Sequence, residues 1–141
     1  MEKIISKREP GKLLHIIYRQ KDLATQQKRG VDITPEEMAL QTRAIKAGTG
    51  DIFPAHKHRP QERATNATQE SIIVMRGSVK ATYYDTDDAA LLTTVLTPGD
   101  IAVTFAGGHR FEILEENTLL YEHKNGPYNG YAKDKEMIPD D

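Results

Sequence analysis

Short apolar runs separated by turn-forming residues are the dominant pattern along this chain. Residues 79–84, for example, read Val-Lys-Ala-Thr-Tyr-Tyr and alternate apolar and polar positions with a period of two, as expected for a strand with one buried face. Acidic residues at 85–88 and the Pro-Gly pair at 98–99 favour chain reversals. We expect strands at residues 13–18, 38–46, 51–58, 70–75, 79–84, 91–96, 101–105, 110–114 and 119–123. Many short strands broken by turns predict an all-β sandwich or barrel.

The N-terminal part of the chain is less regular. Residues 19–33 are polar and predict a loop outside the β-structure. Residues 34–37 then read Thr-Pro-Glu-Glu, a helix start, but the alternation that follows limits the predicted helix to one short turn. Gln41 and Arg43 share one face of the next expected strand, and they are candidates to bind a substrate if that face lines the interior. If the face is turned to solvent, they are ordinary surface residues.

Composition narrows the class of protein. The 141-residue length predicts a single domain, residues 1–141, with a core at about 38–124 between an N-terminal strand and a C-terminal tail. The net charge of -2, with both signs interspersed, indicates neither a nucleic-acid partner nor an anionic membrane. The absence of cysteine leaves only nitrogen and oxygen ligands for a metal. Without an apolar N-terminal core of about 7–15 residues, we expect no signal peptide and no membrane span, and hence a cytoplasmic protein.

Histidine and glutamate residues suggest a metal site. His56 and His58 are separated by one residue, so in a strand both imidazoles would point to the same side and could chelate one ion. Glu70 opens the next apolar run, and the polar loop before it would let the carboxylate fold back beside the histidines. His109, which follows a short strand and a paired-glycine turn, is the fourth candidate ligand. Glu62 is an alternative carboxylate, although a strand positions a ligand better than a polar loop does.

These residues follow two known motifs in order. The first motif is matched by Gly50, His56, His58, Glu70 and Gly77, and the second by Gly99, Gly107 and His109. In both, the chain resembles the cupin superfamily, specifically its small single-domain metal-binding members. The chain departs from the pattern in the long gap between His58 and Glu70, in Phe105 at a proline position and in Ile113 at an asparagine position. The resemblance implies a double-stranded β-helix, or jelly-roll, barrel with a metal inside its mouth, often in a homodimer.

The donor set and the resemblance together suggest a function. Three imidazoles and one carboxylate suit one divalent transition metal, Mn, Ni, Fe, Zn, Co or Cu, and leave coordination positions open for a ligand. The resemblance implies an enzyme of isomerase, lyase or oxygenase type acting on a small polar metabolite, such as a sugar derivative or organic acid. The alternative is a non-catalytic metal- or metabolite-binding module. His123 and Tyr121 are candidates to move protons and Tyr128 to bind substrate, whereas surface or packing roles are the competing interpretation for all three. His15, inside the first strand, is predicted to be a packed or surface residue.

Overall fold

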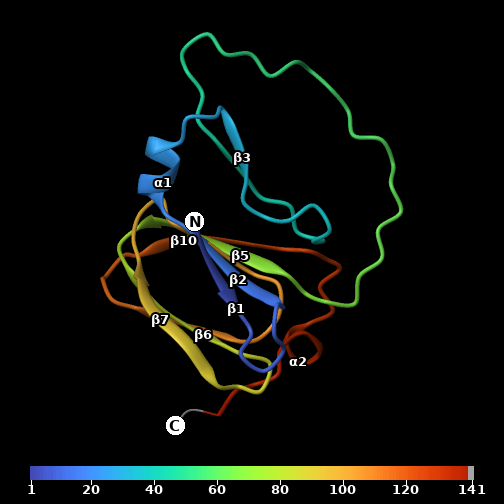
Figure 1. Cartoon of the computed structure of the whole chain (residues 1–141), viewed down its shortest axis with the longest axis vertical. Coiled ribbons are helices and arrows are strands. Elements are labelled where there is room, and N and C mark those ends of the chain that lie inside the picture. The colour runs from blue at the N-terminus through green and yellow to red at the C-terminus, as the bar shows by residue number, and fades with distance from the viewer. Residues whose placement is uncertain (140–141) are drawn as a thin grey trace.

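The computed structural model describes residues 1–139 of the chain (Figure 1). Ten strands and two short helices occur in this part of the chain. In chain order they are β1 (Glu2–Ile5), β2 (Leu13–Tyr18), α1 (Gln20–Thr25), β3 (Gly30–Asp32), β4 (Arg43–Ile45), β5 (Glu70–Arg76), β6 (Val79–Tyr84), β7 (Ala90–Leu96), β8 (Ile101–Thr104), β9 (His109–Ile113), β10 (Leu119–Lys124) and α2 (Tyr131–Asp134).

The strands form antiparallel sheets, which confirms the all-β prediction. A five-stranded sheet has the order β1-β2-β8-β5-β10, and a three-stranded sheet has the order β7-β6-β9. Strands β3 and β4 form a separate hairpin. Both β9 and β10 are edge strands, so the two larger sheets do not close into a barrel within the described part of the chain.

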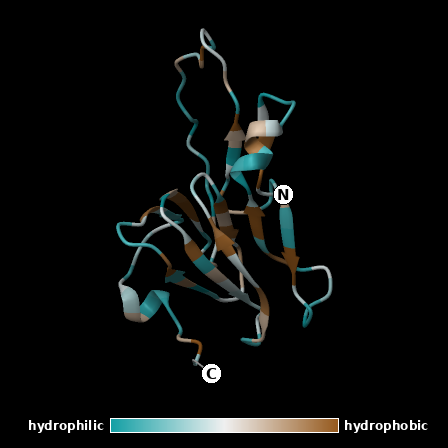
Figure 2. Cartoon of the chain, turned by 90° about the vertical axis from the view of Figure 1, so that its left-hand side faces the viewer, coloured by the Kyte–Doolittle hydropathy of each residue, from teal (hydrophilic) through white to brown (hydrophobic). Residues whose placement is uncertain are grey.

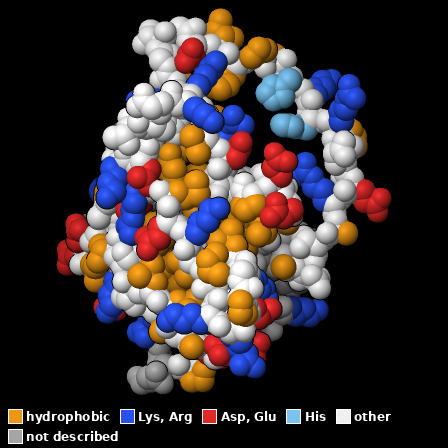
Figure 3. Space-filling view, viewed as in Figure 1, with side chains coloured by type: hydrophobic (Ala, Val, Ile, Leu, Met, Phe, Trp, Pro, Cys, Tyr) orange, Lys and Arg blue, Asp and Glu red, His pale blue; other side chains and the backbone are white. Residues whose placement is uncertain are grey.

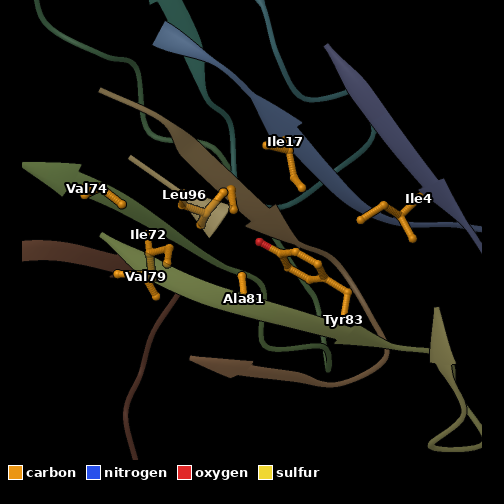
Figure 4. Close-up of a cluster of buried hydrophobic side chains, with 9 residues drawn as sticks. Ile4, Ile17, Ile72, Val74, Val79, Ala81, Tyr83 and Leu96 are labelled. Atoms are coloured by element: carbon orange, nitrogen blue, oxygen red, sulfur yellow. The ribbon is translucent and has the colours of Figure 1, made fainter. Parts of the chain in front are cut away.

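A hydrophobic core fills the space between the two larger sheets (Figure 4). Strand β6 contributes Val79, Ala81 and Tyr83, all fully buried, while the residues between them are exposed or half-buried. This alternation follows from the two faces of a strand, one turned to the opposite sheet and one to solvent. Ile72 and Val74 of β5 supply the facing side chains. The face of each sheet that is turned toward this core is called its inner face below.

A second cluster covers part of the outer face of the five-stranded sheet. There Ile16 and Val103 pack against Ile33 and Ala44, which belong to the β3–β4 region. The hairpin therefore shields one half of that outer face.

The N-terminal hairpin is tied to the three-stranded sheet by a buried carboxylate. Asp85, directly after β6, is 1% exposed. It accepts hydrogen bonds from the Ser6 hydroxyl (2.6 Å) and from the backbone N–H groups of Lys7 (2.6 Å) and Arg8 (3.2 Å). Because these donors come from the β1–β2 turn, Asp85 links the two sheets at one end of the sandwich.

Residues 46–69, called the arm here, leave the body of the molecule in a wide, extended arc (Figures 1 and 2). The structure has no strand at residues 51–58, where the sequence predicts one. Two prolines, Pro54 and Pro60, remove backbone donors from this stretch, and no neighbouring strand pairs with it. The side chains from Lys46 to Thr68 are exposed.

The N-terminal region differs from the sequence prediction in several places. Strand β3 lies within the predicted loop 19–33, and the strand predicted at 38–46 is limited to β4. Helix α1 lies within the predicted loop 19–33, and its first turn is closed by Asp22, whose carboxylate accepts from the Arg19 backbone N–H (3.4 Å). The single short turn predicted after Thr34 is present, closed by a hydrogen bond from the Met38 N–H to the Pro35 carbonyl oxygen (3.1 Å), but it is not part of a helix. The Thr34 hydroxyl accepts from the Thr42 backbone N–H (2.9 Å), so it does not cap a helix. Within residues 1–139 no helix has the length and apolar character needed to cross a bilayer.

Candidate functional site

A polar row crosses the inner face of the five-stranded sheet at one end. Strand pairing places Lys124 of β10 opposite Glu70 of β5, Glu70 opposite Thr104 of β8, and Thr104 opposite His15 of β2. Directly paired residues in antiparallel strands project to the same face, so these four side chains stand side by side. A polar row at the end of an otherwise apolar interior is the natural place for a binding site.

Glu70 and His109 join the two sheets within this row. The Oε1 atom of Glu70 lies 2.8 Å from the Nε2 atom of His109, although the two residues stand on β5 and β9 of different sheets. The Glu70 side chain is 9% exposed and that of His109 is 23% exposed. Burial by itself would raise the pKa of Glu70, but the hydrogen bond and charge of His109 outweigh it and hold that pKa below its usual value. Glu70 is therefore an anion at neutral pH.

The His109 ring has one nitrogen still unused. The ring stacks on Phe111, with centroids 4.9 Å apart and planes inclined by 26°. Its Nδ1 atom is buried and has no hydrogen-bond partner in the described part of the chain. A buried polar atom without a partner is costly in an ordinary core and marks a position where a ligand or a moving segment would supply the missing contact.

His15 is a fully buried, neutral member of the same row. Its Nε2 atom lies 3.1 Å from the backbone carbonyl oxygen of Tyr84, and its Nδ1 atom lies 3.1 Å from the Thr104 hydroxyl. Burial lowers the pKa of His15 to about 4. A carbonyl oxygen only accepts, so Nε2 carries the proton and Nδ1 accepts from the Thr104 hydroxyl. Of the two roles predicted for His15, packed or surface, its 0% exposure shows the packed one.

The structure does not bring the other two predicted ligands to this pair. His56 and His58 lie on the arm, both exposed, with their ring centroids 5.2 Å apart. The Nδ1 atom of His56 lies 2.8 Å from the Pro54 carbonyl oxygen. Glu62, the alternative carboxylate, is also exposed on the arm, which stands away from the body along much of its length (Figure 3). Among residues 1–139, no group of three or more His, Asp or Glu side chains is arranged to hold a metal.

The candidate substrate-binding residues of the β3–β4 region are engaged elsewhere. The Gln41 amide donates to the carbonyl oxygens of Pro35 (2.9 Å) and Met38 (2.6 Å) and so closes the turn before it. Arg43 forms an exposed ion pair with Asp32 at 3.0 Å. Neither contact faces the Glu70–His109 pair.

Of the candidate residues near the C-terminus, Tyr121 and His123 lie on another surface, whereas Tyr128 lies beside Lys124 of the polar row. Tyr121 and His123 alternate with Lys124 along β10, so they project to the outer face of the sheet, and both are exposed. Tyr128 is 58% exposed, and the Nζ atom of Lys124 lies 4.4 Å from its ring centroid. The residues that sequence analysis missed are Thr104 and Lys124. They adjoin Glu70 only through strand register, which no local pattern reveals.

No protein-family model, curated protein or solved structure matches this chain. The site therefore has to be interpreted from its own geometry and from the motif residues.

Proposed function

We propose that this chain is a cupin-type protein whose Glu70 and His109 form the fixed half of a site for one divalent transition metal. The contact between these two side chains carries the proposal, because it brings together one residue from each predicted motif. His56 and His58, the other half, would come from the arm.

The donor atoms of the fixed half fit a metal. Two ligands about 2.1 Å from one ion and at right angles to each other lie about 3.0 Å apart, close to the 2.8 Å between Glu70 Oε1 and His109 Nε2. Glu70 is ionised, as a carboxylate ligand must be. With both arm histidines added, the set is three nitrogens and one oxygen, which suits Mn, Ni, Fe, Zn, Co or Cu.

The arm is long enough to deliver its histidines. Twelve residue steps separate His58 from Glu70, a reach of about 40 Å when extended, and the diameter of a compact chain of this size is about 37 Å. Among residues 1–139, β6 is the strand that pairs with β9, which carries His109 and stands at the edge of its sheet. We propose that the arm adds to this edge as a further strand, which would place both histidines on one side and complete a jelly-roll barrel.

A bound metal with open positions would supply Lewis acidity toward the oxygens of a small polar metabolite. We propose a sugar derivative or an organic acid as that metabolite, in an isomerase, lyase or oxygenase reaction. In this reaction Glu70 and His109 would hold the metal between the two sheets and so fix where the metabolite binds. A non-catalytic binding module would use the same residues without turnover. We also propose a homodimer, which light scattering at micromolar concentration would test.

Metal titration calorimetry with Mn²⁺ and Ni²⁺ tests the proposal. We expect one equivalent to bind the wild-type protein and the His123→Ala variant, whose changed histidine lies on the outer face. The His109→Ala variant should lose binding, and the His56→Ala, His58→Ala double variant should bind at least about tenfold more weakly.

Undiminished binding in the His109→Ala variant would contradict the proposed site. Undiminished binding in the double variant would contradict only the proposal that the arm brings His56 and His58 to the metal, and not the Glu70–His109 site itself. A panel of sugars and keto acids, tested with the metal-loaded protein, then separates an enzyme from a binding module, because only the enzyme converts a substrate.

A further inference from the structure

The chain after β10 returns across the end of the sandwich that holds Glu70 and His109. Residues 131–138, called the strap here, contact this end at separate points. Asp134 Oδ2 accepts from the Nζ atom of Lys124 at 2.7 Å, and Asp134 Oδ1 lies 3.4 Å from the Thr68 hydroxyl.

Ile138 marks the far end of the strap. A Cβ atom added to Gly108 would overlap the Cδ1 atom of Ile138 and lie 3.4 Å from Tyr84 Cβ. Gly108 directly precedes His109, and the Tyr84 carbonyl oxygen is the partner of His15. Asp134 thus contacts Lys124 at one end of the polar row, and Ile138 lies beside Gly108, which directly precedes His109. Between these two contacts lies Glu70, which is only 7% exposed although it is the first residue of its strand.

The strap has little secondary structure of its own. Helix α2 has four residues, none of them buried, and a helix this short has little stability of its own. A polar cavity of about 270 Å³ is lined by residues 65–68 on one side and by Asn125, Lys133 and Asp134 on the other. Segments with few buried contacts open at low free-energy cost.

Lys124 determines which chemical group can take the place of Asp134 when the strap moves away. Its side chain is 20% exposed, and it stands beside Glu70 in the row with Asp134 as its anionic partner. If the strap leaves, the ammonium group loses that partner and presents its charge next to the Glu70–His109 pair. A carboxylate on an incoming ligand has the same chemistry as Asp134 and would restore the contact.

We propose that the strap is a gate over the Glu70–His109 pair and that an anionic ligand, specifically a small carboxylic acid, opens it by replacing Asp134 on Lys124. This inference rests on the proposed function only in that it takes the Glu70–His109 pair as the ligand site. It requires no metal, so it can be tested on protein kept in a chelator.

Carbethoxylation of histidines by diethyl pyrocarbonate, followed residue by residue by mass spectrometry, measures opening of the gate. Exposed His123 is the internal reference and buried His15 reports loss of the fold. We expect Asp134→Asn to raise the labelling rate of His109 at least about fivefold, because side chains that are only 20% and 13% exposed form a stronger ion pair than surface residues do. The matched control is Asp32→Asn, which breaks an exposed ion pair far from the strap and should leave the rate unchanged.

Two variants move the other end of the strap. Gly108→Ala displaces Ile138 by adding an atom, and Ile138→Ala removes the contact without adding one, so either can stand in if the other does not fold. Both should accelerate labelling of His109 while His15 stays protected. If the labelling rate of His109 is unchanged in Asp134→Asn, Gly108→Ala and Ile138→Ala, the gate is refuted. If the rate rises only in Gly108→Ala and Ile138→Ala, the role of the Asp134–Lys124 ion pair in holding the strap closed is refuted.

Ligand exchange has its own measurement. Pyruvate and gluconate, each titrated in chelator and followed by amide chemical shifts, should bind Asp134→Asn more tightly than wild type, since the competing carboxylate is gone. Lys124→Met should abolish this binding. If neither carboxylate binds wild type or Asp134→Asn, the exchange at Lys124 is refuted, while loss of metal binding alone would bear only on the metal site.

Discussion

Substitution of Gly107 by alanine tests how tightly the polar row is supported. Gly107 has a φ of +74°, which costs a residue with a Cβ atom about 1–2 kcal/mol. The added Cβ would also collide with the Tyr84 carbonyl oxygen and lie 3.3 Å from the Nε2 atom of His15. Moving that carbonyl leaves the buried Nε2–H of His15 without an acceptor, at about 1–3 kcal/mol. Together these effects predict a loss of about 2–5 kcal/mol in the free energy of unfolding.

Gly11 is the matched control, because its φ is +87° and a Cβ atom there would meet nothing within 4 Å. Gly11→Ala should therefore lose only the conformational part, about 1–2 kcal/mol. Urea unfolding at pH 7 gives both values, and the melting temperature should fall by about 4 °C for each kcal/mol. Equal losses for the two variants would show that the Tyr84 carbonyl moves freely and would refute the close packing around His15.

Three further results are expected. His15 should make stability depend on pH: its folded pKa is about 4 and its ordinary value 6.5, so its contribution is complete above pH 6.5 and is lost as the pH falls toward 4. The drop in unfolding free energy from pH 7 to pH 5 should therefore be about 2 kcal/mol smaller in His15→Gln, and an identical drop would contradict a neutral buried His15. Leu96→Ala, at a fully buried position, should destabilise by about 2–5 kcal/mol in chemical denaturation, whereas Leu119→Ala, 51% exposed, should cost under about 1 kcal/mol. Brief trypsin digestion should cut the arm first, at Lys57 and Arg63, and early cuts within β5 or β6 would contradict an exposed arm.

Most of the strands between residues 70 and 124 could be predicted from the sequence because each carries its own signal. The predicted segment 79–84 is β6, and the predicted segment 13–18 is β2. Alternation fixes which side chains face the core, and a strand with one buried face needs little else to be recognised. Strand β1, residues 2–5, was missed because its Glu-Lys-Ile-Ile sequence is short and half charged.

Non-local contacts account for what the sequence did not predict. The Thr34 hydroxyl, which the sequence suggests as a helix cap, instead accepts a hydrogen bond from the Thr42 backbone N–H. The segment 51–58, expected to be a strand, has no partner strand in the structure. The pairing of Glu70 with His109 agrees with the motif order, but Thr104 and Lys124 join it only through the register of three strands. Register depends on which strands meet, and that information is distributed over the whole chain.

The hydrogen bonds from residues 6–8 to Asp85 have a consequence for how the molecule opens. Because the turn between β1 and β2 is fastened to the end of β6, the N-terminal hairpin cannot detach without exposing a buried carboxylate. Amide hydrogens in β2 and β6 should consequently exchange with solvent through one shared opening event, while those of the arm exchange independently and far sooner.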